Sequence, residues 1–288
     1  MSVVINTNIA SISAARSLSD TKGSLERAME RLSSGKRING AKDDAAGMSV
    51  ATRMKAQVVS LNQAIRNAND GISMVSTFDG AADEIEDILI RMRELATLVQ
   101  NGTYTTADAN NANLEFKALI AEIDRIQSKT KFNGTLDISS NTSNQTYSFQ
   151  VGFGGGEAIS IAFGSLGASG LTGGVDLSAA GFDIGGEDAH GSNISHASAA
   201  VTTLDTALGN LNSRRALAGA VINRLEHTVS NLMNVVQRTE EARSRIEDAD
   251  FAAESAALAR ANVLVQAGSA MLAQANQNPQ FVLALLRN

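Results

Sequence analysis

The sequence predicts a mainly α-helical protein: a long antiparallel helical coiled-coil bundle with paired terminal helices and a small β-hairpin and loop insert. Over long stretches, apolar residues recur at alternating steps of four and three, the a/d pattern of helices that pack side by side. One proline and 4% aromatic residues among 288 fit long helices with thin cores. The helical pattern stops at residues 132–196, which are rich in glycine and serine.

The longest unbroken pattern covers residues 54–99, which contain no proline. Its apolar positions are Met54, Val58, Leu61, Ile65, Ala68, Ile72, Val75, Phe78, Ala82, Ile85, Leu89, Met92, Ala96 and Val99. At about 1.5 Å per residue, this helix would be roughly 70 Å long. A helix of that length cannot bury its own apolar stripe, so we expect a second long helix beside it.

A shorter helix precedes it and carries leucines that alternate with small residues. Its stripe is Ala14, Leu18, Thr21, Leu25, Ala28 and Leu32. Because small side chains let helices approach closely, we expect this arm to pack tightly on partners. Residues 33–47 are a polar joint, in which Asp43 or Asp44 is expected to cap the long helix.

A third helix and two strands follow the long helix. The helix stripe is Ala112, Phe116, Leu119, Ile123 and Ile126. Its connection, residues 101–110, is short and polar, so this helix should fold back antiparallel. Residues 146–153 and 157–163 flank a glycine run and alternate enough to form a β-hairpin. The rest of the insert has little capacity for a core of its own.

The partner of the long helix is predicted at residues 197–236. Its stripe is Ala197, Val201, Leu204, Leu208, Leu211, Arg215, Ala218, Ile222, Leu225, Val229, Leu232 and Val236. Arg215 is the charged member, and we expect it to fix the helix register or to reach an acidic neighbour.

The last helix begins near Asp250 and is rich in alanine. Its stripe is Leu258, Ala261, Val265, Gly268, Leu272 and Ala275, and an apolar tail follows at Phe281, Val282, Leu283, Leu285 and Leu286. Such a tail marks a contact surface.

The patterns are nested, which predicts three domains. Residues 1–44 and 250–288 form a terminal helical core domain of paired arms, residues 45–138 and 195–249 a helical rod domain, and residues 139–194 a short Gly/Ser-rich variable insert. We expect the arms to be disordered in a monomer, because they cannot bury their stripes alone.

Charge and composition exclude several classes of function. The net charge is -6. Residues 1–44 carry seven basic and five acidic residues (+2) and residues 250–288 two of each, so the middle carries -8 and argues against nucleic acid. The chain has no cysteine, which excludes disulfides and thiolate metal sites. No cleavable signal peptide is visible, and the many amides in residues 261–286 argue against membrane insertion.

No catalytic, cofactor or metal site is predicted. None of the three histidines, His190, His196 and His227, lies beside a plausible nucleophile and acid, so we expect solvated or packing roles. The run GFGGGE lacks the Lys-Ser/Thr of a phosphate-binding loop. Four acidic residues of the insert have a spacing that fits no calcium loop: Asp176, Asp183, Glu187 and Asp188.

Several blocks resemble bacterial flagellins, in order along the chain. They are INTNIASISAARSL at residues 5–18, ERLSSGKRINGAKDDAAGMSVATRM at 30–54, RNANDGISMVSTFDGA, RMRELATLVQNGT, EIDRI, KFNGTL, and IEDADFAAESAALARANVLVQAGSAMLAQANQNPQFVLALL at the far end. Lys36 stands where an apolar residue is common in the family, and Gly40 where serine is common. The resemblance covers residues 1 to about 137 and about 195 to 288, and leaves out the insert.

The resemblance implies a structural subunit that polymerises into the helical bacterial flagellar filament used for motility. Such subunits are exported unfolded by the flagellar type III secretion system and are secreted into the extracellular filament. The terminal stripes would form its coiled-coil core: Leu18, Leu25, Leu32, Leu258, Val265 and Leu272. Implied partners are further copies of the chain, the flagellar cap and hook-junction proteins, and an export chaperone that binds the tail at Phe281, Leu283 and Leu286.

The resemblance also implies an outward surface at Arg91, Leu95 and Glu115. In the family this surface contacts the next subunit, and in many flagellins the animal Toll-like receptor for flagellin binds it. From the residues alone, it is a solvated, salt-bridged face. Ile90 and Thr97 depart from the commonest surroundings of this surface.

Three other functions were weighed against a filament subunit. The alternative within the same system is a hook–filament junction protein, which the full 30–54 block and the NPQFVLALL ending disfavour. A secreted enzyme or adhesin would need a larger insert with a better core. A cytosolic coiled-coil scaffold would not need the apolar tail.

Overall fold

The structure is a computed structural model that describes residues 8–134, 136–137, 145–172, 183–185 and 190–286. Its helices are α1 (Ile9–Ser34), α2 (Ala45–Val99), α3 (Thr106–Lys129), α4 (Ala168–Leu171), α5 (His190–Glu247) and α6 (Phe251–Leu286). Its strands are β1 (Lys131–Phe132), β2 (Leu136–Asp137), β3 (Gln145–Gln150) and β4 (Ala158–Phe163). The chain divides into two compact units, Met1–Val58 with Gln237–Asn288, and Val59–Val236. The three predicted domains stay a prediction.

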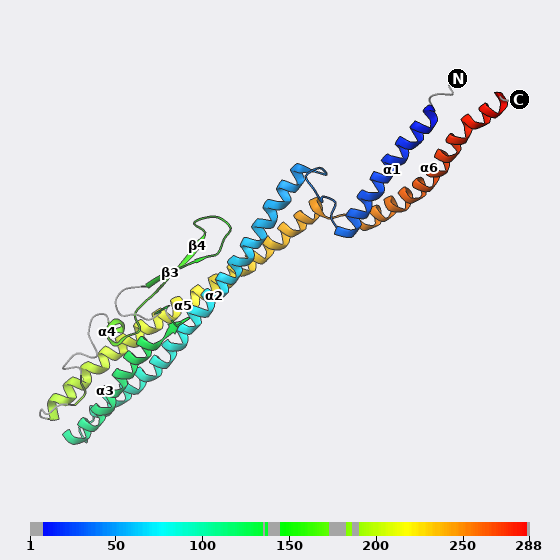
Figure 1. Ribbon diagram of the computed structural model, residues 1–288. Coiled ribbons are helices and arrows are strands. Elements are labelled where there is room, and N and C mark those ends of the chain that lie inside the picture. Colours follow the sequence, from blue (N-terminus) through cyan, green and yellow to red (C-terminus); the bar gives the residue numbers. More distant parts are fainter. Residues whose placement is uncertain (1–7, 135, 138–144, 173–182, 186–189, 287–288) are drawn as a thin grey trace. The chain divides into compact units, whose positions relative to one another are not determined.

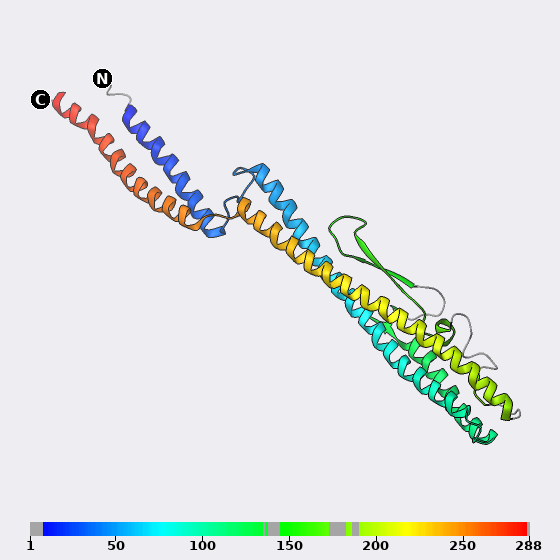
Figure 2. The same cartoon turned by 180° about the vertical axis from the view of Figure 1, so that it is seen from behind.

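In the first unit, α1 and α6 lie side by side and antiparallel, as both ribbon views show (Figures 1 and 2). Asn8 Nδ2 donates to the carbonyl of Ala275 at 2.7 Å, while at the other end of the pair Arg31 Nη1 lies 2.8 Å from Glu254 Oε1. The side chains that face the partner are those of the predicted stripes, and Ala28, Ala261 and Ala275 are buried. The predicted pairing of the terminal helices is confirmed.

Small residues allow this close pairing. A Cβ atom added at Gly268 would lie 3.2 Å from Leu18 Cδ1, so the Leu18 side chain packs closely against α6 at this glycine. Leu18, Leu25, Leu32, Leu258, Val265 and Leu272 are half-buried. In a pair of helices, each stripe is covered from one side only. The leucines are therefore partly buried and do not form a closed core.

The polar joint next to the arms, residues 33–47, is held by backbone hydrogen bonds and by the side chains of Asp43 and Asp44. Gly35 ends α1 with φ 70°, in the left-handed region that favours glycine. The N–H of Arg37 donates to the carbonyl of Glu247 at 2.7 Å, and that of Ala249 to Gly35 at 3.0 Å. Asp44 Oδ1 accepts from the N–H of Gly47 at 2.8 Å, the contact of the predicted N-cap.

In the second unit, the long helices α2 and α5 pack along each other and α3 folds back beside α2 (Figure 1). The predicted stripe of α2 from Val58 to Val99 is buried or half-buried throughout, and Val75, Ile85 and Leu89 have no exposed surface. α3 begins with a capping box, in which Thr105 accepts from the N–H of Asp108 and Asp108 accepts from that of Thr105. Its buried side includes Phe116 and Ile123.

The predicted hairpin is confirmed as the antiparallel pair β3–β4, in register from Gln145 opposite Phe163 to Gln150 opposite Ala158. On β4, Ile159, Ile161 and Phe163 are buried and alternate with exposed residues. The rings of Phe78 and Phe163 lie 5.0 Å apart. The described residues of the insert therefore share the core of the helices, which fits the expectation that the insert has little core of its own.

Glycine permits one close approach within this unit. A Cβ atom at Gly71 on α2 would lie 3.3 Å from Leu225 Cδ1 and 3.4 Å from the ring of Phe149. The hairpin and α5 therefore both reach α2 at this point. The fold class matches the predicted one, mainly α with paired terminal helices and a small antiparallel insert.

Candidate functional site

Both paired arms leave large apolar side chains exposed, and we refer to these side chains together as the arm surface. Its exposed members are Ile9, Ile12, Met29, Phe251, Val263, Leu264 and Met271. Exposure reaches 70% at Phe251 and 69% at Ile9. These apolar side chains are removed from water only when another molecule covers them. Their number on the two arm helices therefore indicates an interaction site.

A shallow groove runs between the two arm helices. Its volume is about 490 Å³, and it is lined by small residues from both helices together with Leu18, Leu264 and Met271. Ser11 Oγ donates to Asn276 Oδ1 at 2.7 Å near one end of the pair. The groove and the exposed apolar side chains occur on the same two helices.

Residues Phe251–Gln277 of α6 meet the length and composition of a membrane-spanning helix, and only 6% of that stretch is buried. The same stretch carries Asn262, Gln266, Gln274 and Asn276. Amide side chains are costly in hydrocarbon, so the stretch fits packing on other protein helices better. The predicted tail side chains Phe281, Leu283 and Leu286 lie outside the described side chains.

Arg91 and Glu115 form the centre of the second predicted surface. Arg91 Nε lies 2.8 Å from Glu115 Oε1 on α3, and Arg91 Nη1 lies 2.7 Å from Glu94 Oε2. The hydrogen bonds that Arg91 donates to Glu115 and then to Glu94 raise the pKa of Arg91. All three side chains are about half exposed or more. The predicted salt-bridged face is therefore present across α2 and α3.

Leu95 corrects the predicted surface. It is 4% exposed and belongs to the core shared by α2, α3 and α5, so the prediction that it faces outward is wrong. The a/d pattern selects Met92 and Ala96 as inward residues, but a helix enclosed by several elements buries a wider stripe that includes Leu95. The outward apolar residue nearby is Ile90, which is 52% exposed.

Beside Arg91, the structure shows a hollow that the sequence reasoning missed. Ile90, Arg93, Thr97, Leu98 and Tyr104 line it together with Glu94 and Asn101. Arg93 Nε lies 2.7 Å from Asp205 Oδ1 on α5, and this contact raises the pKa of Arg93. Nothing in the spacing of the sequence pairs residue 93 with residue 205, since the two are distant along the chain.

Arg215 is the charged residue of the α5 stripe, and it reaches three carboxylates on α2. Its guanidinium lies 3.1 Å from Asp79 and 2.9 Å from Asp83, and it also pairs with Glu86. Burial lowers its pKa, but the hydrogen bonds that it donates to Asp79 and Glu86 outweigh this effect and raise the pKa overall. The expectation that Arg215 reaches an acidic neighbour is confirmed.

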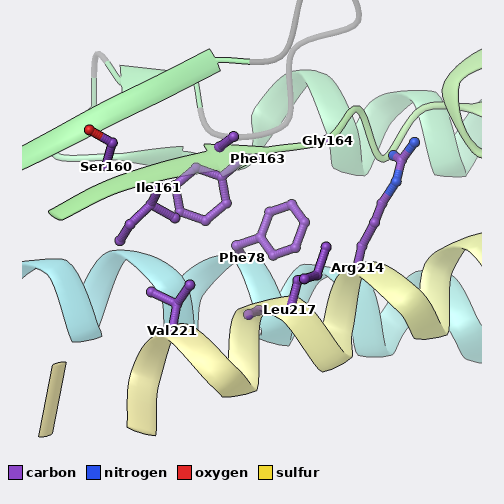
Figure 3. A pocket seen from close by; sticks show the side chains of 10 residues that line it. Phe78, Ser160, Ile161, Phe163, Gly164, Arg214, Leu217 and Val221 are labelled. Atoms are coloured by element: carbon purple, nitrogen blue, oxygen red, sulfur yellow. The ribbon is translucent and has the colours of Figure 1, made fainter. Parts of the chain in front are cut away.

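Next to Arg215, Arg214 points to the other side of α5. Figure 3 shows it at one end of a groove between β4 and α5, in which Phe78 and Phe163 lie centrally and Val221 toward the other end. Arg214 Nη2 donates to the carbonyl of Gly170 at 2.8 Å. Its Nη1 is buried and has no hydrogen-bond partner in the described part of the chain. The sequence reasoning did not single out this residue.

Among the described residues, two of the remaining candidate side chains contact each other at Asp183. His196 Nδ1 lies 3.5 Å from Asp183 Oδ1, and Lys117 Nζ lies 4.0 Å from Asp183 Oδ2. Two basic neighbours do not favour calcium at Asp183. Asp176, Glu187 and Asp188 lie outside the described residues. Within the described part of the chain, no group of three or more acidic or histidine side chains could hold a metal ion.

Two family models match the chain. The model of the bacterial flagellin N-terminal helical region covers residues 5–139, and that of the C-terminal helical region covers residues 201–286. Together they span the helices that form the arm surface and the Arg91–Glu115 contact. They leave out most of the insert.

Relatives match over nearly the whole chain. Flagellin from Halalkalibacterium halodurans is 42% identical over 285 residues, covering 99% of this chain and 100% of the relative. The flagellar filament 33 kDa core protein of Treponema phagedenis is 38% identical over 294 residues, covering 99% and 100%. A solved structure described as a flagellar hook-associated protein from Vibrio parahaemolyticus has a TM-score of 0.59 at 13% identity, covering 72% of this chain and 100% of that one, and shows the fold alone. With both family models and full-length relatives in agreement, the chain belongs to the bacterial flagellin family.

Proposed function

We propose that the chain polymerises with copies of itself into a helical flagellar filament, with the arm surface as its main contact between subunits. The observation that carries this proposal is the exposed apolar side of α1 and α6, which includes Ile9, Phe251 and Met271. Head-to-tail contacts that do not close on themselves produce a filament rather than a ring. The role is structural, and no catalytic step is proposed.

Assembly is coupled to the stabilisation of the arms. The expectation that the arms are disordered in a monomer stays a prediction, although the structure has α1 and α6 as helices. Their half-buried stripes and exposed apolar side chains nevertheless make them the segments of lowest expected local stability. Neighbouring subunits would cover the arm surface, so the filament gains both contacts and order.

Hydrogen exchange tests this coupling on the monomer and on the assembled filament. Amides of residues 9–32 and 255–277 should exchange quickly in the monomer and slowly in the filament. Amides near Ile85 and Ile123 should be protected in both. Strong protection of the arms in the monomer would contradict the proposal.

A pair of substitutions tests the arm surface directly. Leu264 and Met271 are 50% and 65% exposed, so Leu264→Ser with Met271→Ser should leave the Val59–Val236 unit folded. Electron microscopy under polymerising conditions should show no filaments for this variant. Gln274→Ser, at an exposed polar position of the same helix, is the matched control and should polymerise. Normal filaments from the double variant would reject the proposed contact.

A second subunit contact is proposed at Arg91 and Glu115, on the outward side of α2 and α3. Two observations support it: the side chains are held in place by hydrogen bonds, and the exposed Ile90 lies next to them. The double substitution Arg91→Glu with Glu115→Arg keeps an ion pair between the two positions but exchanges the places of the positive and negative charges on this surface. Filament yield should fall for the exchanged variant while its thermal unfolding stays near that of the unmodified chain.

The same surface is proposed to bind the animal Toll-like receptor for flagellin. Monomer applied to receptor-bearing reporter cells should activate them, and Arg91→Ala or Glu115→Ala should weaken activation. Arg125→Ala removes another exposed arginine from an ion pair with Glu122 and serves as the control. Full activation by the Arg91→Ala variant would show that the receptor does not bind at this surface.

Export and the remaining partners are proposed on the basis of family membership. The chain would leave the cell unfolded through the flagellar type III system into the extracellular filament, and the absence of cysteine fits passage without oxidation. Flagellar cap and hook-junction proteins would meet it at the filament ends. An export chaperone would bind Phe281, Leu283 and Leu286, so changing all three to serine should abolish co-purification with a co-expressed chaperone.

The alternative, a hook–filament junction protein, is not favoured by the family matches. The hook-associated structure that resembles this fold is only 13% identical to the chain. The electron microscopy above also separates the two roles, because a filament subunit polymerises in bulk from its own copies.

A further inference from the structure

The groove between β4 and α5 combines apolar walls with the side chain of Arg214, which forms no ion pair with the residues that the structure describes. Phe78, Ile161, Phe163 and Val221 form its walls, and its volume is about 500 Å³. Figure 3 shows Arg214 rising from α5 at one end, beside Gly164. Concave apolar sites of about 300–1,000 Å³ with a few polar groups are typical of small-molecule binding.

The two neighbouring arginines of α5 differ in what surrounds them. Arg215 pairs with three carboxylates on α2, whereas Arg214 has no ion pair within the described residues. Among the described residues, Arg214 Nη2 donates one hydrogen bond, to the carbonyl of Gly170, and Nη1 donates none. Burial lowers the pKa of Arg214. A partly desolvated guanidinium without an anion is unfavourable, and a carboxylate would relieve this.

Space beside the guanidinium is created by a glycine. A Cβ atom at Gly164 would lie 2.8 Å from Arg214 Nε, so a larger residue there would displace the side chain. The rim of the groove is formed by Leu217, which is 67% exposed, and by the exposed Ser160. The groove is therefore open to a ligand from solution.

We propose that this groove binds a small amphiphile with an apolar body and a single carboxylate, held by Arg214 at the polar end and by Phe78, Phe163 and Val221 along the body. Charge complementarity selects the anion, because the structure already places a free donor at one end of the apolar walls. The proposal is independent of filament assembly, since every lining residue belongs to the Val59–Val236 unit.

Octanoate titrated into the full-length monomer tests the proposal by methyl NMR. The methyl resonances of Ile161, Leu217 and Val221 should shift together and saturate, while those of Ile123, buried away from the groove, should not. 1-Octanol has the same body without the charge, so it should bind roughly tenfold more weakly or worse. This comparison needs no substitution in the protein.

Variants of Arg214 test whether its guanidinium binds the carboxylate of octanoate. Arg214→Gln should weaken octanoate binding roughly tenfold but leave octanol binding unchanged. Arg238→Gln changes an exposed arginine outside the groove and should bind as the unmodified chain does. If Arg214→Gln proves unfolded by circular dichroism, Arg214→Lys keeps the charge without the planar fork and should still prefer octanoate to octanol.

Three outcomes would overturn the proposal. They are the absence of saturable shifts at millimolar octanoate, equal affinity for octanol, and unchanged octanoate binding by a folded Arg214→Gln variant. Shifts confined to residues of α1 and α6 would place the amphiphile on the arm surface instead and would also reject the groove.

Discussion

The arms and the Val59–Val236 unit use the same four-and-three spacing but bury it to different extents. In the arms, Leu18, Leu25 and Leu32 are half-buried, and Ala28 is the member of the α1 stripe that is fully covered. In the second unit, Val75, Ile85 and Leu89 have no exposed surface. The period specifies which side of a helix is inward, and the number of elements around that side determines how much is buried.

The burial differs because α2 is packed against more elements than α1 is. Around α2, α5 covers one flank, α3 another, and the β3–β4 hairpin adds Phe163 against Phe78. Around α1, the structure places α6 as the packing partner. A helix pair leaves each stripe covered from one side, so the arms depend on other subunits for the cover that α2 finds within its own chain.

The largest expected effect is the loss of a core aromatic in the enclosed unit. Phe116 has no exposed surface, and Phe116→Ala should reduce the free energy of unfolding by about 3–5 kcal/mol. Leu25→Ala in the half-buried arm stripe should cost under about 1.5 kcal/mol, because the site already meets water. Urea unfolding followed by circular dichroism measures both.

Phe116→Ala and Leu25→Ala should also differ in their effect on filament assembly. Leu25→Ala should lower filament stability more than monomer stability, because the filament completes the cover of the arms. Equal monomer losses for the two variants would mean that the arms are as well enclosed as the second unit.

The next effect concerns Arg215, which joins α5 to α2. Arg215→Met should cost about 1–2 kcal/mol after allowance for solvent screening, because it leaves three carboxylates close together without a cation. Arg125→Met removes an exposed arginine from a local pair on α3 and should change stability little. Thermal unfolding at low salt compares the two, and similar losses would show that the Arg215 contact is ordinary surface pairing.

Sequence pattern predicted the helices, their stripes and the hairpin, because period is a local property of the chain. It also predicted that Arg215 fixes the helix register or reaches an acidic neighbour, and the structure shows the acidic neighbours. It failed at Leu95, where burial depends on a third helix, and it did not single out Arg214, whose surroundings come from β4 and Gly170. Pairs such as Arg93 with Asp205 depend on how two long helices align, which spacing within either helix does not specify.

A smaller effect is expected at the start of α3. Thr105 caps the helix through the N–H of Asp108, so Thr105→Ala should cost about 1 kcal/mol. Thr103→Ala, at an exposed position of the same loop, is the control. Loss of the cap should also increase hydrogen exchange at the first turn of α3, and unchanged exchange there would mean that the reciprocal hydrogen bonds contribute little.

The smallest effect is electrostatic and compares one aspartate in each unit. Hydrogen bonds from the side chain and N–H of Thr105 lower the pKa of Asp108, and backbone N–H groups of Asn39 and Gly40 lower that of Asp43. Because each pKa is lower in the folded state, each stabilisation is present above the ordinary value of about 3.9 and is lost as pH falls through the folded value. Carbon-13 NMR of the carboxyl groups should therefore show both titrating below the ordinary value. Thr105→Ala should return the pKa of Asp108 toward it and leave Asp43 unchanged, whereas a parallel shift of both would show that the two units respond together to a local change.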